Sequence, residues 1–197
     1  MSATAGGFVP GSGAGAMVLE DLDYAQARGA TIYAEILGGA TNGGGQRNGG
    51  TMTAANPKGV VRCINEALAG AGVKPDEIDL ISGHLTATHA DKAELEYWAT
   101  ALGRKGADFP LVNSVKSMIG HCLSAAGSIE SVGAVLQLLH GFVHANLNIE
   151  DPDAAITDFI DIDRIPASTI KKLIKRLPKP TCEFANYNTS YLFPKPK

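Results

Sequence analysis

Lys116 and His121, two side chains able to carry a positive charge or a proton, stand in one short polar turn of the sequence. The turn follows a β-type run and precedes five small residues: Ser124, Ala125, Ala126, Gly127 and Ser128. Small residues let a backbone or a thin ligand approach closely, and a helix N-terminus favours developing negative charge. The pattern indicates a site that could stabilise negative charge during a reaction. A single Lys and His in a loop are, however, more often solvated surface residues.

A second histidine, His84, also follows an apolar strand, residues 78–81. The residues after it are polar and lead into a helix: Thr86, Thr88, Asp91 and Glu94. Two strand ends, each bearing a histidine and each followed by a helix, predict a site at the carboxyl edge of a sheet.

The elements that position these turns alternate between strand and helix patterns. Strands are predicted at 14–20, 31–37, 78–81 and 110–114, and helices at 21–28, 57–70, 91–102 and 123–139. Asn56 is expected to cap the helix that begins at Pro57, and Gly70 or Gly72 to end it. This order is typical of an α/β fold with a layered, largely parallel sheet.

The last part of the chain is less regular. We predict a short helix at 168–176 and strands at 182–186 and 190–193, after an acidic loop at 150–163. No internal repeat or low-complexity linker divides the sequence, so residues 1–197 are expected to form one domain.

Glycine is concentrated in two clusters, at 6–15 and 38–50. The first does not fit a phosphate-binding loop, because no Lys-Ser/Thr pair follows and the next segment is β-type. A tight turn and a glycine-bearing strand are the better interpretation. The second is expected to be a surface loop.

Composition excludes several classes of partner. The net charge of −3 gives no reason to expect nucleic acid or an anionic membrane surface. No apolar run is long enough to span a membrane, and residues 1–7 do not resemble a secretory signal. The three cysteines are scattered, which predicts neither a disulfide framework nor a metal site and favours a reducing cytoplasm. His89, His140 and His144 receive no role.

The two histidine turns resemble motifs of the β-ketoacyl-acyl-carrier-protein synthases, the condensing enzymes of fatty acid and polyketide synthesis. The family's His-Gly-Thr-Ser-Thr turn stands here as His-Leu-Thr-Ala-Thr at 84–88, and its Lys-Ser-x-x-Gly-His turn at 116–121. Its Gly-Ala-Ala-Gly-x-x-Glu helix start is matched at 124–130, and 8–20 resembles the strand that opens the family's C-terminal half. The resemblance runs from about residue 7 to about residue 186. It implies the C-terminal half of a thiolase-like α/β fold.

The resemblance also implies roles for the two histidines. In the family, a cysteine holds the acyl chain and two histidines help decarboxylate the malonyl extender, which identifies His84 and His121 as that pair. Imidazole N–H groups aimed at the enolate oxygen stabilise the transition state, by roughly 3–4 kcal/mol per donor in analogous oxyanion sites.

The same resemblance assigns the remaining site residues. Lys116 is expected to orient the site through Glu94, with Asp91 nearby, and Glu130 to give structural support. Thr86 and Thr88 match hydroxyls that bind the phosphopantetheine arm, a task that suits a group able to donate and to accept. No metal or other cofactor is implied, and the expected partner is an acyl carrier protein.

Three departures from the family pattern stand out. No residue matches the nucleophilic cysteine, which lies in the family's N-terminal half, and Cys63 and Cys122 are expected to be small apolar core residues. Leu85 and Ala87 replace Gly and Ser in the first turn, and we expect leucine to resist a positive φ and to reshape that turn. Residues 184–190, without glycine, stand where the family has Gly-Phe-Gly-Gly-Thr-Asn.

The sequence therefore predicts a half-site that is inactive alone and needs the N-terminal half, or a partner chain, bearing the nucleophile. Such a half exposes apolar faces, so self-association is expected. The expected assembly is a homo- or heterodimer. The alternative is a non-catalytic partner that resembles a chain-length factor. The thiolase branch is disfavoured, because the two-histidine pattern belongs to the decarboxylating branch.

Overall fold

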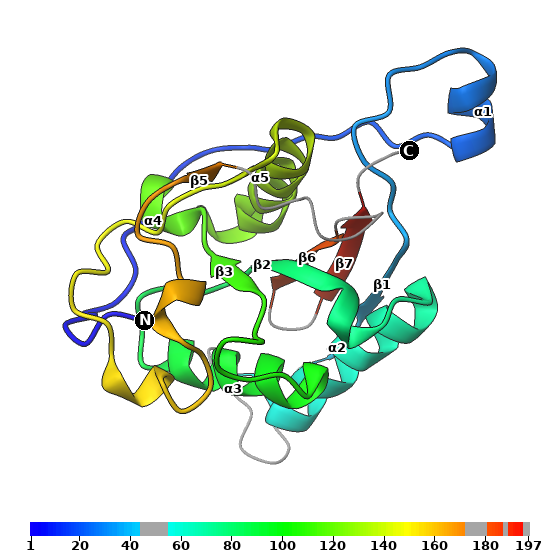
Figure 1. Ribbon diagram of the computed structural model, residues 1–197. Helices are drawn as coiled ribbons and strands as arrows, with labels where there is room; N and C mark the ends of the chain where they lie inside the picture. The colour runs from blue at the N-terminus through cyan, green and yellow to red at the C-terminus, as the bar shows by residue number, and fades with distance from the viewer. Residues whose placement is uncertain (44–54, 172–180, 187–188, 195–197) are drawn as a thin grey trace.

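A five-stranded mixed sheet, in the order β1-β7-β6-β2-β3, forms the centre of the molecule (Figure 1). The structure, a computed structural model, describes residues 1–43, 55–171, 181–186 and 189–194, and side chains through residue 170. The strands are β1 (Gly38–Thr41), β2 (Ile78–Ser82), β3 (Leu111–Asn113), β6 (Thr181–Asn186) and β7 (Thr189–Pro194). β2 pairs in parallel with β3 and β6, whereas β7 pairs antiparallel with β6 and β1. The parallel pairing that the sequence predicts holds for the part of the sheet that carries the histidine turns.

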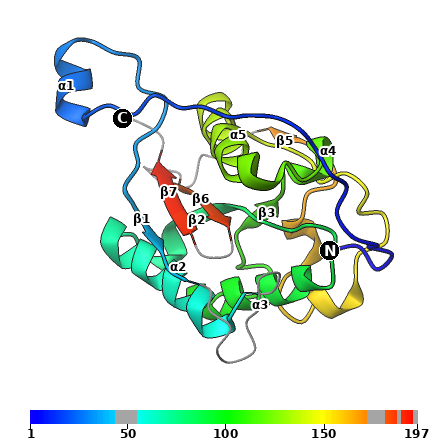
Figure 2. The same cartoon turned by 180° about the vertical axis from the view of Figure 1, so that it is seen from behind.

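Helices cover both faces of the sheet, as the two opposite views show (Figures 1 and 2). α5 (Ala126–His140) lies on one face, and α2 (Pro57–Ala71) and α3 (Ala90–Leu102) lie on the other. The larger core, which includes Ile64, Trp98 and Phe109, lies on the side of α2 and α3. The smaller core joins Leu80 and Leu111 to α5. The result is a layered α/β fold.

The register of β2 and β3 follows from these two cores. Leu80 lies beside Leu111 and both face α5, whereas Ile81 lies beside Val112 and both face α2 and α3. Successive side chains of a strand alternate between faces, so a slip by one residue would exchange the two cores. The register therefore sets where each strand ends, and with it where each histidine turn begins.

The four helices predicted before residue 140 are confirmed, with their caps. The side chain of Asn56 accepts hydrogen bonds from Lys58 N and Gly59 N at 3.0 and 3.3 Å, and Gly72, at φ 63°, ends α2. α3 and α5 end at Gly103 and Gly141, which are also left-handed. α1 (Leu22–Ala27) begins at its cap Asp21 and projects from the body of the molecule (Figure 1).

Shorter elements complete the described part. α4 (Lys116–Ile119) follows β3 and precedes the 3₁₀ turn η3 (Leu123–Ala125) that leads into α5. Further 3₁₀ turns are η2 (Pro75–Glu77), η4 (Ala154–Ile156) and η5 (Ile162–Arg164). β4 (Phe142–Val143) and β5 (Ile170–Lys171) form a small antiparallel pair. No helix in the described ranges is both long and apolar enough to cross a membrane.

Two predicted strands, 14–20 and 31–37, are wrong. Both segments are strand-free and partly exposed, with Val18 97% and Leu19 69% exposed. A β-type sequence becomes a strand only when a neighbour completes the ladder of hydrogen bonds. No described segment of this chain pairs with these residues in that way.

The glycine cluster at 38–50 was expected to be a loop, but it begins as β1. The Cα of Gly38 lies against Ala71 at the end of α2, where an added Cβ would be 2.9 Å from Ala71 N. Glycine lets the strand pack closely on the helix. Residues 44–50 lie outside the described residues.

The tail prediction is partly confirmed. β6 and β7 lie where strands were predicted, but Ile170–Lys171 is a strand rather than the start of a helix. Although its sequence pattern is helical, this segment is a strand because it pairs with β4. Residues 172–180, the rest of that predicted helix, lie outside the described residues.

Candidate active site

His84 and His121 lie side by side. Their ring centroids are 5.1 Å apart and the rings meet edge to face at 85°. His84 follows β2, and His121 follows β3 and α4, so the carboxyl ends of two neighbouring parallel strands bring them together. The structure thus brings the two histidines together at the predicted edge of the sheet.

The turn of His84 is held by carboxylates of α3. The two carboxylate oxygens of Glu94 accept hydrogen bonds from His84 N at 2.7 Å and Leu85 N at 2.9 Å. Asp91 accepts from the next three backbone N–H groups, of Thr86, Ala87 and Thr88, at 2.9 to 3.4 Å. The two acidic residues, one helical turn apart, thus fix the turn through its backbone.

The same turn contains two non-glycine residues with positive φ. Leu85 has φ 22° and Ala87 has φ 58°. Leucine was expected to resist such a conformation, and that expectation is wrong. The side chain of Leu85 is 5% exposed, and its packing in the core together with the two carboxylates offsets the strain of its backbone.

The hydrogen bonds of His121 identify its tautomer. Its Nδ1 accepts a hydrogen bond of 3.2 Å from Leu123 N. A neutral imidazole carries a single proton, so this proton is on Nε2. His121 therefore offers an Nε2–H donor to whatever occupies the site.

Lys116 and Glu130 form a buried ion pair next to the histidines, between α4 and α5. The side chains of Lys116 and Glu130 are 5% and 1% exposed, respectively. The direct partner of Lys116 is Glu130, whereas both oxygens of Glu94 bond to the His84 turn. That Lys116 orients the site through Glu94 stays a prediction. The Lys116 charge also acts on Glu94. Burial raises the pKa of Glu94, and the positive charge of Lys116 partly opposes that rise.

Electrostatics keep both imidazoles neutral. Burial, the Lys116 charge and the neighbouring His121 lower the pKa of His84 to about 3. Burial and then Lys116 also lower the pKa of His121. Burial raises the pKa of Glu94 and of Glu130 to about 7. At neutral pH, two uncharged N–H donors lie beside one cation, an arrangement suited to stabilising a developing oxyanion.

The hydroxyls of Thr86 and Thr88 lie at the rim of the same turn, 3.2 Å apart. That of Thr88 also accepts a hydrogen bond from Ala90 N at the start of α3. Both follow His84 in the same turn. Their role toward a pantetheine arm stays a prediction.

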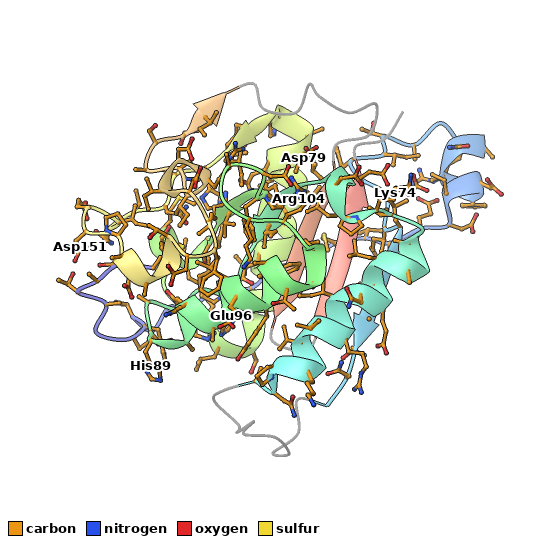
Figure 3. The ribbon with its side chains drawn as sticks, turned by 60° about the horizontal axis from the view of Figure 1, so that its bottom comes forward. Lys74, Asp79, His89, Glu96, Arg104 and Asp151 are labelled. Atoms are coloured by element: carbon orange, nitrogen blue, oxygen red, sulfur yellow. The ribbon has the colours of Figure 1, made fainter. Side chains whose placement is uncertain are left out.

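The residues given no site role lie elsewhere. His89 is exposed and projects from the start of α3 (Figure 3). His144 is buried, and its Nδ1 bonds to Ala145 O. Cys63 and Cys122 are buried, as expected. Among the described residues, no three His, Cys, Asp or Glu side chains converge as a metal site would require.

Sequence reasoning missed a buried amide at the edge of the sheet. Asn146 accepts from Ser114 N at 3.0 Å and donates to Val112 O at 3.0 Å, so its side chain pairs with β3 as a strand would. The nearby side chains of Asn113 and Gln137 are hydrogen-bonded to each other at 2.6 Å. A buried amide in a loop has no periodic signal, so the sequence offers no sign of it.

Comparison with known families agrees with this geometry. The family model described as the β-ketoacyl synthase C-terminal domain matches residues 33–150. The chain belongs to the β-ketoacyl synthase family. It corresponds to the C-terminal half of these condensing enzymes, whose fold is thiolase-like.

Relatives and solved structures support the membership. The chain is 45% identical to 3-oxoacyl-[acyl-carrier-protein] synthase II, chloroplastic, of Arabidopsis thaliana, over 76% of this chain and 27% of the relative. It is 38% identical to 3-oxoacyl-[acyl-carrier-protein] synthase 2 of Vibrio harveyi, over 84% of this chain and 39% of the relative. This chain thus spans well under half the length of these relatives.

The solved structures share the fold. The ishigamide ketosynthase/chain length factor matches all of this chain and 46% of its own, with 31% identity and a TM-score of 0.81. A type II polyketide ketosynthase solved in complex with its acyl carrier protein matches 90% of this chain and 42% of its own, with 30% identity and a TM-score of 0.72.

Proposed function

We propose that this chain supplies the two-histidine half of a β-ketoacyl-[acyl-carrier-protein] synthase site. The reaction joins a malonyl unit, carried on an acyl carrier protein, to an acyl thioester with loss of carbon dioxide. The observation that carries the proposal is the pair of neutral imidazoles 5.1 Å apart at the ends of two parallel strands.

The chemistry follows from where charge develops. The bond between the malonyl carboxylate and the α-carbon breaks, carbon dioxide leaves, and the electron pair moves to the thioester oxygen as an enolate. The Nε2–H of His121 and an N–H of His84 donate to that oxygen. Because both donors are already fixed and uncharged, they need little reorganisation as the charge appears.

The second step forms the carbon–carbon bond. The enolate carbon attacks the carbonyl of an acyl group held as a thioester on a cysteine. The carbon–sulfur bond then breaks, the cysteine leaves as a thiolate, and the β-ketoacyl product stays on the carrier protein. That cysteine is proposed to lie on the N-terminal half of the synthase or on a partner chain, since Cys63 and Cys122 are buried away from solvent.

Other residues have supporting roles in this proposal. Glu94 and Asp91 hold the His84 turn, and Glu130 holds the ammonium group of Lys116 near both rings. Thr86 and Thr88 are proposed to bind the phosphopantetheine arm. The chain is proposed to act as part of a homo- or heterodimer, without a cofactor of its own. A cytoplasmic location stays a prediction, and the relatives include chloroplastic enzymes.

A second candidate is a non-catalytic subunit that shapes the acyl pocket of an active synthase. The replacement of Gly and Ser by Leu85 and Ala87 in the first turn favours it, as does similarity to a ketosynthase/chain length factor pair. The neutral His121 with its donor on Nε2 favours the catalytic role.

Alanine variants of the two histidines distinguish the candidates. We expect His121→Ala and His84→Ala, in the complete synthase, each to lower carbon dioxide release from malonyl-acyl-carrier protein by ~10²–10³-fold. His89→Ala is the matched control, because it removes an exposed imidazole at the start of α3, the helix that follows the His84 turn (Figure 3). An unchanged rate with an altered product length would establish the pocket-shaping role instead.

A further inference from the structure

An extended N-terminal segment, residues 7–15, passes both histidine turns, and we call it the strap. Gly7 N donates to Ala87 O, in the His84 turn, at 2.9 Å. Two residues later, Val9 O accepts from His121 N at 2.7 Å, and Gly11 N donates to His121 O at 3.0 Å. Both backbone groups of His121 therefore bond to the strap, which also bonds to the turn of the other histidine.

The glycines of the strap are required by close packing. A Cβ on Gly11 would lie 2.4 Å from Ile119 O and 3.1 Å from Gly120 C, both backbone atoms that cannot rotate away. A Cβ on Gly15 would lie 2.6 Å from Ser128 C. From the other side, a Cβ on Gly120 would lie 2.8 Å from Val9 O. The alternating glycines 11, 13 and 15 are therefore an inward-facing edge that lies on the turn of His121 and the start of α5.

Gly7 and Phe8 add to the same arrangement. Gly7 has φ 116°, a conformation that side-chain-bearing residues rarely adopt, at the point where the strap bonds to Ala87. The ring of Phe8 lies edge to face against His121, with centroids 5.0 Å apart. Contacts from the strap thus reach the imidazole as well as the backbone of His121.

The structure assigns to the strap the role of a positioning element that sets the separation of His84 and His121, with Gly11 as its decisive residue. This role rests on the proposed function, because it concerns the same pair of N–H donors. The two turns come from different strands, and the strap is a backbone segment that bonds directly to both of them. Misplacement of a reacting group by about 1 Å can cost ~10²-fold in rate.

The separation of the rings is testable in the chain itself by nuclear magnetic resonance. Edge-to-face rings with centroids 5.1 Å apart should give a nuclear Overhauser effect between the ring protons of His84 and His121. We expect Gly11→Ala to weaken that effect and to shift the His121 ring resonances. Gly6→Ala is the matched control, because an added Cβ there meets nothing within 4 Å. An unchanged effect in Gly11→Ala would overturn the inference without touching the proposed function.

Carbon dioxide release in the complete synthase gives the second readout. Gly11→Ala is expected to lower the rate by about 10- to 10²-fold, and to add little to the loss in a His121→Ala background, because it acts through His121. Full additivity of the two losses would show a general structural effect and would overturn the inference. A normal rate in His121→Ala would instead overturn the proposed function.

Should Gly11→Ala not fold, Gly13→Ala tests the same strap more mildly. Its added Cβ would lie 3.0 Å from Ile129 Cδ1, the flexible end of a side chain. We expect the same weakening of the effect between the rings, at smaller amplitude. Circular dichroism shows whether Gly13→Ala is folded. An unchanged nuclear Overhauser effect between the two rings in the folded variant would contradict the positioning role.

Discussion

The two histidine turns both bond to the strap but are otherwise held in different ways. The His84 turn is buried and is held by side chains close in sequence, since Glu94 lies 10 positions from His84. The His121 turn is more exposed and is held through its own backbone by the strap, more than a hundred positions away. Both arrangements leave a neutral imidazole at the same edge of the sheet.

The difference bears on what each turn tolerates. A turn held by two buried carboxylates depends on charge, and on pH through Glu94, because burial raises the pKa of that group to about 7. A turn held by backbone hydrogen bonds and glycine packing depends on shape, because the backbone groups that form these bonds carry no charge. Substitutions that alter charge should therefore affect the His84 side, and added methyl groups the His121 side.

The largest expected effect concerns the ion pair behind both turns. Lys116→Met leaves the buried carboxyl of Glu130, 1% exposed, without its ion-pair partner. We expect a loss of ~3–5 kcal/mol in the free energy of unfolding, measured by denaturant titration. The double variant Lys116→Met/Glu130→Gln should recover much of that loss. A double variant no more stable than Lys116→Met would contradict the pairing.

A smaller loss is expected from Glu94→Gln. The amide that replaces one carboxylate oxygen faces the N–H of His84 or Leu85 and leaves it without an acceptor. The expected cost is about 1–3 kcal/mol in the free energy of unfolding. Glu96→Gln, an exposed residue of the same helix (Figure 3), is the control and should be nearly neutral. Equal effects of the two substitutions would refute the side-chain clamp on the His84 turn.

The pH dependence of stability sharpens the contrast. The pKa of His84 is lowered to about 3 from its ordinary value of 6.5, so its contribution is present above pH 6.5 and is lost as the pH falls. The stability of the wild type relative to His84→Asn should therefore decline by ~1.4 kcal/mol per pH unit below pH 6.5. The raised pKa values of Glu94 and Glu130 act in the opposite direction, and to first order they cancel in the difference. Urea titrations of both proteins at pH 6.5 and pH 5 provide the measurement. An equal difference in unfolding free energy between the two proteins at both pH values would contradict the prediction.

The smallest effect is a gain. Ala87 is exposed and has φ 58°, so Ala87→Gly should relieve backbone strain and stabilise the chain by ~1 kcal/mol. The same change at Ala69, exposed in α2, should instead cost ~0.5–1 kcal/mol. Thermal unfolding of the two variants in parallel distinguishes them. A loss of stability in Ala87→Gly would mean that the turn does not have this conformation.

Local signals explain what the sequence predicts well. Asn56, Gly72, Gly103 and Gly141 cap helices through contacts within a few residues, so spacing alone finds them. The histidine turns follow apolar strands, and their proximity follows from parallel pairing of β2 and β3.

Long-range contacts explain what the sequence does not predict. Residues 14–20 and 31–37 have a strand pattern, yet a pattern does not supply a pairing partner. The partner of Lys116 is Glu130 rather than Glu94, which depends on how α5 packs beside α4. The sequence predicts a tight turn and a glycine-bearing strand around the glycines at 11, 13 and 15, but no strand forms there, and their packing against the His121 turn explains them instead.

The most direct test of the half-site is an intact-mass spectrum of the purified chain after incubation with an acyl thioester donor. If the nucleophile lies on another polypeptide, the mass will be unchanged after denaturation. A stable acyl adduct on Cys63, Cys122 or Cys182 would contradict this, because the chain would then carry its own acyl-holding thiol.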